Sequence, residues 1–342
     1  MSEPAMEEIF DLAIIGAGPA GLACALHAGR RGLKARILEK GTVANTIVGY
    51  PTGMRFFSTT DRLELADIPF TSIEPRPTRV EAISYYQGIA RRSGLDISVG
   101  NRVHGVRRLP EGGFDIDATV GCHARNVVLA TGYFDQTNRL NVPGEDLPHV
   151  HYYYREPYPF YGLDVVVVGG RNSAVETALD LYRHGARVTI IHRGDRFGDG
   201  VKYWIRPDIE NRVADGSISV IWNSRVREIT SESVIVGSNE TGELQEIPCR
   251  ALIAHIGYRP DQALLDACGI AYEPVTLVPD YDPVTLETNV PDLYLAGSVA
   301  CGCQTWEIFI ENSREHAITV VEEILRRGQG GAGLRLHQTG SI

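Results

Sequence analysis

The 342-residue sequence is poor in cysteine, and its six cysteines are scattered along the chain. Only Cys301 and Cys303 lie close together, and no spacing matches the ligand pattern of a zinc site. These absences exclude a disulfide-stapled scaffold and a structural zinc domain, and we predict no metal site. Scattered thiols are typical of a protein that works in a reducing compartment.

The sequence also lacks long apolar runs and an excess of basic residues. No stretch reaches the apolar length that a membrane span requires, and residues 1–8 are acidic, without the basic start of a signal peptide. Its 33 Lys and Arg against 43 Asp and Glu give a net charge of −10, which argues against nucleic acid or an anionic membrane as the main partner. We therefore predict a cytoplasmic protein.

One pattern occurs twice in the sequence: an apolar strand, a glycine turn, a helix and a second strand. Segment 11–16 matches segment 164–169, and a constant offset of 153 residues then places Gly32 on Gly185 and Gly41 on Gly194. Each copy is typical of a dinucleotide-binding unit, in which backbone N–H groups at a helix N-terminus face a pyrophosphate. Two copies predict two dinucleotides, a flavin and a nicotinamide that exchange a hydride.

The first glycine turn is Gly16-Ala17-Gly18-Pro19-Ala20-Gly21, and Glu39 follows 23 residues after Gly16, at the end of the next predicted strand. A carboxylate at this position accepts hydrogen bonds from ribose hydroxyls and repels a 2′-phosphate. The first site therefore suits an unphosphorylated adenosine, which is that of FAD or NAD.

The second turn, 169–174, differs at two positions. His192 occupies the place of the acidic residue, and Arg193 and Arg196 follow it, so basic groups favour NADPH over NADH. Arg171 stands where a second glycine would let the backbone meet the pyrophosphate. A cationic side chain there can either contact phosphate or weaken the site.

Periodicity predicts the other elements. In the first unit we expect strands at 11–15 and 35–39, helices at 20–31 and near 78–93, strands within 96–120 and an apolar strand at 127–132. In the second we expect the repeat at about 163–194, a helix near 201–215, strands at 218–248 and an apolar strand at 251–257. Because 251–257 echoes 127–132, segment 138–259 is predicted to be inserted into the other domain. A strand at 293–297, a helix at 304–327 and a Gly-rich tail without structure from Gly328 complete the chain.

With these motifs the chain resembles the low-molecular-weight, thioredoxin-reductase-like flavoproteins, and most of all the bacillithiol-disulfide reductase family, also called bacilliredoxin reductases. The resemblance covers about 9–327 and is carried by segments 50–52, 56–58, 130–133, 142–148, 169–173 and 307–312. Arg171 is similar to the lysine that this family usually has there.

The resemblance implies an α/β fold of two Rossmann-like domains. An NADPH-binding domain at 138–259 would be inserted into an FAD-binding domain formed by 1–137 and 260–342, in a homodimer or higher homo-oligomer. It also implies NADPH-dependent reduction of a low-molecular-weight thiol disulfide, such as bacillithiol disulfide, or of its small protein carrier. The identity of the acceptor stays open. Hinge motion is expected near 133–140 and 256–262.

The cofactor-binding residues expected from the motifs and the resemblance fall into two groups. For the first domain they are Gly16, Gly18, Pro19, Ala20, Gly21, Glu39, Lys40, Asn45, Val103, Thr131, Gly132, Gly297 and Ser298. For the second they are Gly169, Gly170, Arg171, Asn172, Ser173, His192, Arg193 and Arg196. Ser298 departs from the aspartate that many related reductases place there, and a hydroxyl binds less strongly.

The redox-active cysteine pairs of thioredoxin reductases and of glutathione-type reductases are both missing. Segments 41–60 and 133–168 contain no cysteine, and Ala20 stands where many members of the resembled family carry one. We hypothesise that Cys303, or the pair Cys301 and Cys303, attacks the substrate disulfide. We expect these thiols at the entry to the last helix, whose dipole would lower their pKa. The alternative is a small-residue turn packed against the cofactor.

Three other functions share parts of this pattern. A ferredoxin- or flavodoxin-NADP reductase has the same architecture and needs no cysteine. A flavin monooxygenase also uses two glycine turns, but of its signature only Val142, Gly144, His149 and Tyr153 come near, without the leading aromatic residue. A redox sensor would hold both nucleotides without turnover. Reduction of an iron-sulfur protein would identify the NADP reductase, and a persistent peroxyflavin would identify the monooxygenase. The absence of NADPH consumption would identify the redox sensor.

Overall fold

The computed structural model describes residues 9–336, with side chains described for 9–328, and the chain divides into two compact units. Unit 2 comprises Thr137–Gly257 and the short stretch Gly49–Gly53, and unit 1 comprises the rest. The stretch Gly49–Gly53 joins unit 2 because the backbone N–H of Thr52 donates to the carbonyl of Arg155 at 2.8 Å. The sequence pattern did not predict that Gly49–Gly53 would belong to unit 2.

Unit 1 is built on a seven-stranded sheet of order β3-β2-β1-β6-β5-β4, with β15 also paired to β6. Strands β3, β2, β1, β6 and β15 pair in parallel, whereas β4, β5 and β6 pair antiparallel. The strands are β1 (Ile9–Ile15), β2 (Ala35–Glu39), β3 (Asp96–Val99), β4 (Val103–Arg108), β5 (Phe114–Ala118), β6 (Cys122–Leu129) and β15 (Leu293–Leu295).

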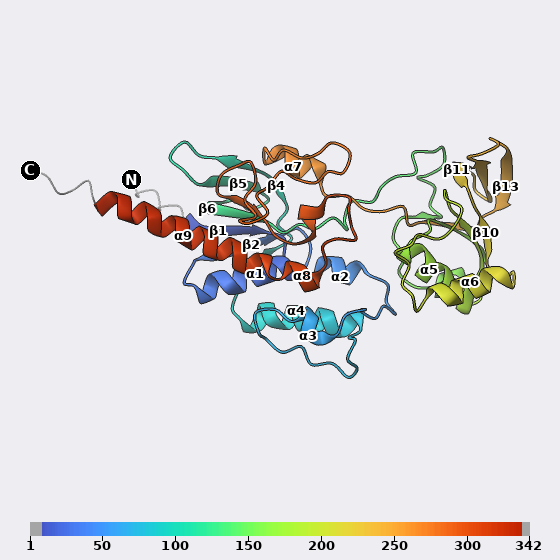
Figure 1. Ribbon diagram of the computed structural model, residues 1–342, viewed down its shortest axis with the longest axis horizontal. Coiled ribbons are helices and arrows are strands. Elements are labelled where there is room, and N and C mark those ends of the chain that lie inside the picture. The colour runs from blue at the N-terminus through green and yellow to red at the C-terminus, as the bar shows by residue number, and fades with distance from the viewer. Residues whose placement is uncertain (1–8, 337–342) are drawn as a thin grey trace, which may run out of the picture. The chain divides into compact units, whose positions relative to one another are not determined.

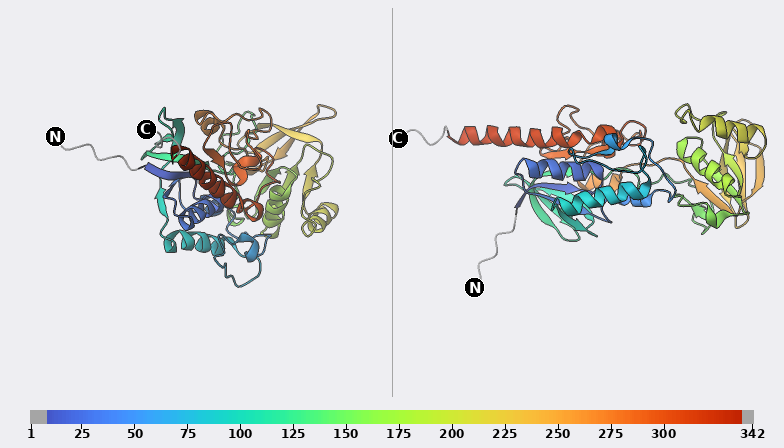
Figure 2. Two further views of the ribbon diagram at one scale, coloured as in Figure 1. Left: turned by 60° about the vertical axis from the view of Figure 1, so that its left-hand side comes forward. Right: turned by 90° about the horizontal axis from the view of Figure 1, so that it is seen from below.

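The helices of unit 1 cover this sheet, and Figures 1 and 2 show α9 running alongside α1. They are α1 (Pro19–Arg30), α2 (Asn45–Gly49), α3 (Thr60–Leu63), α4 (Arg79–Arg92), α7 (Gln262–Ala267), the 3₁₀ helix η2 (Gly297–Cys301), α8 (Ile310–Ser313) and α9 (His316–Leu336). Central strands buried on both faces are continuously apolar, as in β1, where Leu12, Ala13 and Ile14 are fully buried.

Unit 2 has a five-stranded parallel sheet of order β10-β9-β8-β14-β7 and a separate antiparallel sheet of order β11-β12-β13. Its parallel strands are β7 (Val150–His151), β8 (Asp164–Val168), β9 (Arg187–Ile191), β10 (Ser219–Ile221) and β14 (Ala251–Ala254). The antiparallel strands are β11 (Ser224–Ile229), β12 (Ser233–Ser238) and β13 (Leu244–Pro248). The helices are the 3₁₀ helix η1 (Tyr158–Phe160), α5 (Asn172–Arg183) and α6 (Arg206–Ala214).

The sequence repeat recurs as equivalent hydrogen bonds in the two units. The N–H of Gly16 donates to the carbonyl of Leu38 at 2.9 Å, and Gly169, 153 residues later, donates to Ile191 at 3.0 Å. The next bond of the pattern also repeats, because Ala130 donates to Ile15 at 2.9 Å as His255 donates to Val168 at 2.8 Å. The two glycine turns are therefore built on the same scaffold, which confirms two Rossmann-like units in an α/β fold.

The end of the chain differs from the expected helix at 304–327. The short helix α8 comes first, and α9 begins only at His316 and runs to Leu336, through part of the tail that was expected to lack structure. Glycine lowers helix stability but keeps its backbone N–H, so a helix can continue through a Gly-rich stretch. The remainder of that tail, 337–342, lies outside the described residues.

Helix α6 also begins later than the expected 201. Pro207 lies in its first turn, where a missing N–H costs nothing, and this position fixes the start at Arg206. Among the helices in the described part of the chain, none is both long and apolar enough to span a membrane.

Candidate functional site

In unit 1, three segments that follow parallel strands meet at one edge of the sheet. The last residues of β1, β6 and β15 are in register, Ile15 with Leu129 and Leu129 with Leu295. The segments that follow are the first glycine turn, Thr131-Gly132 and Gly297-Ser298. Ligands of open α/β sheets bind at such carboxyl ends, so this edge is the candidate site of unit 1.

The three glycines of the first turn have different surroundings, so each has its own physical reason to be glycine. A Cβ atom on Gly16 would lie 2.6 Å from the carbonyl oxygen of Ala130, and one on Gly21 would overlap the carbonyl oxygen of Gly16. Both glycines are therefore required by packing within the protein. A Cβ on Gly18 would meet nothing within 4 Å, and Gly18 has an ordinary extended φ of −73°. The free space beside Gly18 fits a group that approaches the backbone from outside.

The N-terminus of α1 fits an anion in this space. Gly18 is the N-cap of α1, and no side chain caps the first turn. The first N–H groups of a helix have no partners within the helix and carry the positive end of its dipole. Pro19 and Ala20 begin the helix without adding a competing acceptor. These features fit the pyrophosphate of a dinucleotide.

Glu39 lies beside the turn, with only 6% of its surface exposed. One carboxylate oxygen accepts the N–H of Ala17 at 2.7 Å and the other accepts the N–H of Gly41 at 2.7 Å. Each oxygen keeps a lone pair for a further donor, which fits the hydroxyls of a ribose. Asn45 lies next to Gly41, and Val103 is buried at the start of β4.

Lys40 is ion-paired in the structure. Its Nζ lies 2.7 Å from a carboxylate oxygen of Asp135, in the segment that follows Gly132. This contact links the end of β2 to the chain that leaves β6. Lys40 was expected to bind the cofactor, but the pairing with Asp135 had no signal in the sequence, because the two residues lie far apart.

The other two segments of this edge contact each other and α1 through glycines. Gly132 has a φ of +67°, and a Cβ there would lie 3.4 Å from Oγ of Ser298. Gly297 has a φ of +80°, and a Cβ there would lie 2.8 Å from Cβ of Ala20. The predicted residues Ala20, Gly132, Gly297 and Ser298 therefore do come together.

His316 is a residue of this edge that the sequence pattern did not reveal. Its Nδ1 accepts the N–H of Gly297 at 3.2 Å. Burial lowers the pKa of His316, which keeps the ring neutral, as an acceptor nitrogen requires. The first residue of α9 thus fixes the turn after β15.

The two candidate thiols lie close to this turn but not at a helix N-terminus. Cys301 ends η2, is 2% exposed, and its Sγ donates to the carbonyl of Ser298 at 3.1 Å. Burial raises the pKa of Cys301 to about 11. Burial also raises the pKa of the half-buried Cys303, and the charge of Arg259 partly opposes this shift. The expected lowering by a helix dipole is wrong, because α9 begins only at His316.

In unit 2, packing accounts for both glycines of the second turn. A Cβ on Gly169 would lie 2.5 Å from the carbonyl oxygen of His255, and one on Gly170 would lie 2.5 Å from the ring of His192. Arg171 is the N-cap of α5, with φ −106° and ψ −174°, and no side chain caps the first turn. Arg171 and Ser173 are both exposed, which fits phosphate binding at this helix N-terminus.

Asn172 holds a neighbouring loop. Its Oδ1 accepts the N–H of Lys202 at 2.9 Å, and its Nδ2 donates to the carbonyl of Gly200 at 2.9 Å. The same loop reaches the glycine turn, because the N–H of Gly198 donates to the carbonyl of Gly170 at 2.9 Å. The side chain of Asn172 therefore positions the loop 198–202 over the turn.

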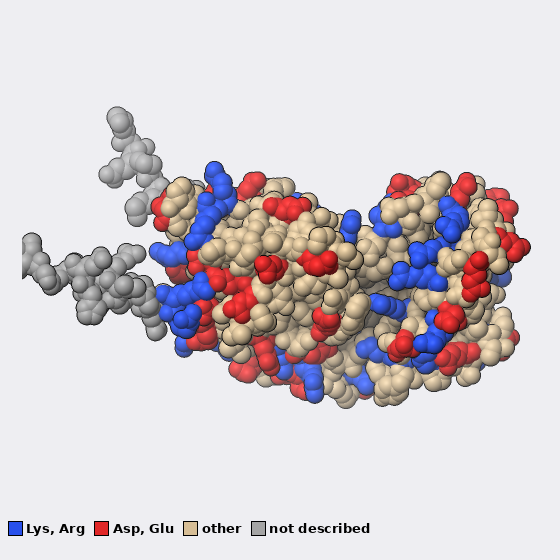
Figure 3. Space-filling model, turned by 45° about the horizontal axis from the view of Figure 1, so that its top comes forward, with Lys and Arg blue, Asp and Glu red and all other residues tan. Residues whose placement is uncertain are grey.

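His192 is packed between the turn and an aromatic ring. It lies against Gly170 on one side, and its ring meets that of Trp222 edge-on at 6.0 Å. Burial, followed by the charge of Arg193, lowers the pKa of His192, so the ring is neutral near pH 7. Positive charge at this strand end comes from the exposed Arg193 and Arg196. Figure 3 shows several Lys and Arg side chains on the visible face of unit 2, with Asp and Glu side chains among them.

The remaining groups to consider in the described part of the chain are metal ligands, thiols and His255. There, no group of three or more His, Cys, Asp or Glu side chains could hold a metal ion. All six cysteines are free thiols. His255 is half-buried, with Nε2 2.9 Å from Oγ1 of Thr177, and burial lowers its pKa to about 4.

Comparison with known proteins fits this geometry. Residues 13–297 match the family model described as pyridine nucleotide-disulphide oxidoreductase. The chain is 38% identical over 315 residues to Bacilliredoxin reductase Bdr of Bacillus subtilis (strain 168), covering 92% of this chain and 97% of that protein. The chain belongs to the bacilliredoxin reductase branch of the pyridine nucleotide-disulphide oxidoreductases.

Solved structures support the same placement. Bacillithiol Disulfide Reductase Bdr (YpdA) from Bacillus cereus superposes with a TM-score of 0.91 at 36% identity, covering 94% of this chain and 100% of that one. The corresponding protein from Staphylococcus aureus gives a TM-score of 0.89 at 36% identity, covering 94% and 99%. The resemblance stated from the sequence is confirmed. The protein is an oxidoreductase, and its cofactors are FAD and NADPH.

Proposed function

We propose that this protein uses NADPH to reduce a low-molecular-weight disulfide of the bacillithiol class, or the small redox protein that carries such a thiol. The similarity to proteins named as bacillithiol disulfide and bacilliredoxin reductases supports this substrate class. The observation that carries the proposal is the contrast between the two turns. A buried carboxylate ends the first repeat and exposed arginines end the second, as a pair of FAD and NADPH sites requires.

We assign FAD to unit 1 and NADPH to unit 2. In unit 1, Glu39 would bind the adenosine ribose, the α1 N-terminus at Gly18 the pyrophosphate, and the segments at Gly132 and Ser298 the rest of the cofactor. In unit 2, the α5 N-terminus with Arg171 and Ser173 would bind the pyrophosphate, and Arg193 and Arg196 a 2′-phosphate. The unpartnered space beside Gly18 and the uncapped helix N-termini support this assignment.

The overall reaction consumes one NADPH, one proton and one disulfide, and it yields NADP⁺ and two thiols. When bound, FAD accepts a hydride from NADPH and passes two electrons on. The contribution of the chain is to hold each nucleotide at the carboxyl edge of its sheet and to supply a site for the disulfide.

We propose Cys303 as the thiol that meets the disulfide. It is the more exposed of the two candidates, and the positive charge of Arg259 favours its thiolate. Attack by Sγ of Cys303 would break the S–S bond of the substrate, form a mixed disulfide and release the first thiol, which takes the proton that Cys303 gives up. The hydride equivalent from NADPH and one proton would then break the mixed disulfide, release the second thiol and restore the Cys303 thiol. Cys301 is buried and donates to Ser298, so we assign it a structural role.

The test is anaerobic reduction of the purified protein with NADPH, followed by a panel of acceptors. We expect reoxidation by bacillithiol disulfide or by an oxidised bacilliredoxin-like protein, and slow reoxidation by glutathione disulfide and ferredoxin. Rapid electron transfer to ferredoxin or flavodoxin without activity on any disulfide would replace the proposal with an NADP-reductase function.

A pair of serine variants tests the thiol. Cys303→Ser should abolish disulfide turnover and leave reduction of the flavin by NADPH unchanged. Cys301→Ser is the matched control, since a buried hydroxyl can keep the bond to Ser298, and most of its turnover should remain. Unchanged turnover in Cys303→Ser would remove the thiol from the mechanism.

We further propose that the protein is a cytoplasmic homodimer or higher homo-oligomer. The family resemblance supports self-association, and the cysteine usage supports a reducing compartment. Light scattering after gel filtration tests the first point, and a monomer at micromolar concentration would contradict it.

A further inference from the structure

The strand end that carries Arg193 is held by a neighbouring sheet. The segment His192–Gly194 follows β9, and the carbonyls of its three residues all accept hydrogen bonds from the β11–β13 sheet region. In chain order, the donors are the N–H of Ser224 at 3.0 Å, Nδ2 of Asn239 at 3.1 Å and the N–H of Asn223 at 2.9 Å. The bond from Asn239 is the one of these three that a side chain makes.

Asn239 is itself fixed by a second asparagine. Its backbone N–H donates to the carbonyl of Asn223 at 2.7 Å. Nδ2 of Asn223 in turn donates to a carboxylate oxygen of Glu240 at 2.9 Å. Asn223 has a φ of +49°, a conformation that asparagine tolerates better than most residues. The turn between β12 and β13 and the turn before β11 thus brace each other and the segment that bears Arg193.

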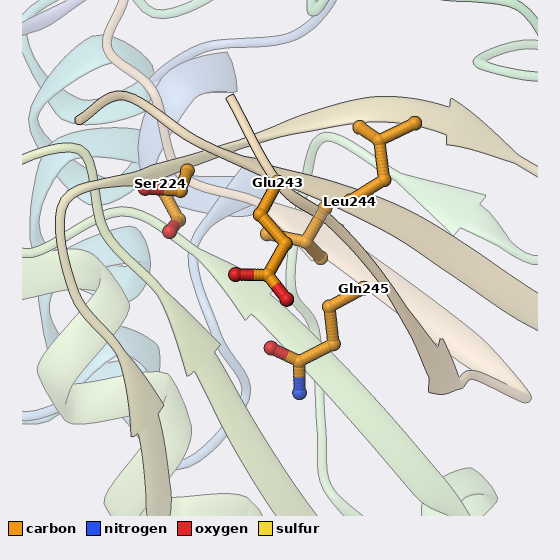
Figure 4. A pocket seen from close by; sticks show the side chains of 6 residues that line it. Ser224, Glu243, Leu244 and Gln245 are labelled. Carbon is orange, nitrogen blue, oxygen red and sulfur yellow. The ribbon is translucent and has the colours of Figure 1, made fainter. Parts of the chain in front are cut away.

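The sheet of β11, β12 and β13 also carries a hollow, and one of its lining residues provides a control variant. Ser224, Val236, Ser238, Glu243, Leu244 and Gln245 line it. Figure 4 shows Glu243 and Gln245 directed to the same side of the hairpin. Among the described contacts, the Glu243 side chain makes no hydrogen bond to His192–Gly194. A change at Glu243 therefore alters the charge of this turn and leaves the bond to Arg193 intact.

We propose that Asn239 is a positioning residue for recognition of the 2′-phosphate of NADPH, and that the β12–β13 turn thereby sets the preference for NADPH over NADH. This inference rests on the proposed assignment of NADPH to unit 2. A guanidinium on a long side chain distinguishes NADPH from NADH better when its backbone is held in place. Each freely moving part of the residue lowers the fraction of time that the guanidinium spends in contact with the 2′-phosphate. Loss of the bond to the Arg193 carbonyl should weaken binding of the 2′-phosphate selectively.

The test compares 2′,5′-ADP with 5′-AMP, which lacks the 2′-phosphate, by titration calorimetry on the FAD-loaded protein. In Asn239→Ala, the affinity for 2′,5′-ADP should fall about three- to tenfold, the amount that one hydrogen bond supplies, with the affinity for 5′-AMP unchanged. The ratio of kcat/KM for NADPH and NADH in flavin reduction should fall by a similar factor. Glu243→Gln should change neither quantity.

Glu240→Ala serves as a second variant, because it removes the partner of Asn223 and leaves Asn239 itself in place. We expect a smaller loss in the same direction, of about twofold. Unchanged discrimination in Asn239→Ala, or an equal loss for both ligands, would overturn the proposal. Wild-type protein that binds both ligands equally would overturn it together with the NADPH assignment. Because no disulfide is used, an inactive disulfide assay would count against the proposed substrate alone.

Discussion

The free space beside Gly18 leads to a prediction in which apoprotein stability and cofactor affinity respond differently. In Gly18→Ala the new Cβ meets no protein atom within 4 Å, and φ at −73° suits alanine. Alanine lowers the conformational entropy of the unfolded chain, which raises the free energy of unfolding by about 0.4–1 kcal/mol. Alanine is a poorer N-cap than glycine, which lowers the free energy of unfolding by a similar amount. We therefore expect the unfolding free energy of the apoprotein to change by less than about 1 kcal/mol.

The affinity for FAD should change more than the stability, because the added methyl group occupies the space that we assign to the pyrophosphate. Overpacking of one methyl group costs about 1–3 kcal/mol, which corresponds to about 5- to 150-fold weaker binding of FAD. Denaturant unfolding of the apoprotein and fluorescence titration with FAD measure the two quantities. Gly21→Ala is the contrasting variant, which should fail to fold because its Cβ overlaps the Gly16 carbonyl. Unchanged FAD affinity in Gly18→Ala would refute the assignment.

Three other predictions concern ionisable groups. Because burial raises the pKa of Cys303, the kcat/KM for the disulfide should rise with pH from neutral to alkaline, and a flat profile would contradict attack by this thiol. The guanidinium groups of Arg326 and Arg327 lower the pKa of Glu323 to about 2, so this carboxylate stabilises the fold above its ordinary pKa, and the contribution is lost as the pH falls toward 2. Glu323→Gln should therefore lower the free energy of unfolding by about 1–2 kcal/mol near pH 7 and by much less near pH 2, as urea titrations at both pH values would reveal. Since His192 is neutral, His192→Asn should keep the NADPH preference within about twofold, and a tenfold loss would show that its ring binds the phosphate.

The fold was predictable because its signals are local or repeated. The offset of 153 residues aligned two apolar strands and two glycine turns, and equivalent backbone bonds at Gly16 and Gly169 follow from that repetition. The last helix was misplaced because its limits depend on tertiary packing. His316 begins α9 where its ring accepts a bond from Gly297, a contact that no sequence pattern encodes.

The candidate sites were predictable in part. Motif spacing located the glycines and Glu39, but the environment of each side chain depended on partners distant in the sequence. His192 was expected to help bind a phosphate, and its burial against Trp222 depends on how β10 pairs with β9. The thiols of Cys301 and Cys303 were expected to be acidic, and burial raises the pKa of both.

The central claim is that electrons pass from NADPH through FAD to a disulfide within this one chain. The most direct measurement is stopped-flow absorbance of the purified yellow protein under anaerobic conditions, with NADPH added first and bacillithiol disulfide second. We predict bleaching of the flavin band by NADPH, a much slower reaction with NADH, and return of the band with the disulfide. A flavin band that NADPH does not bleach, or that no disulfide restores, would contradict the account.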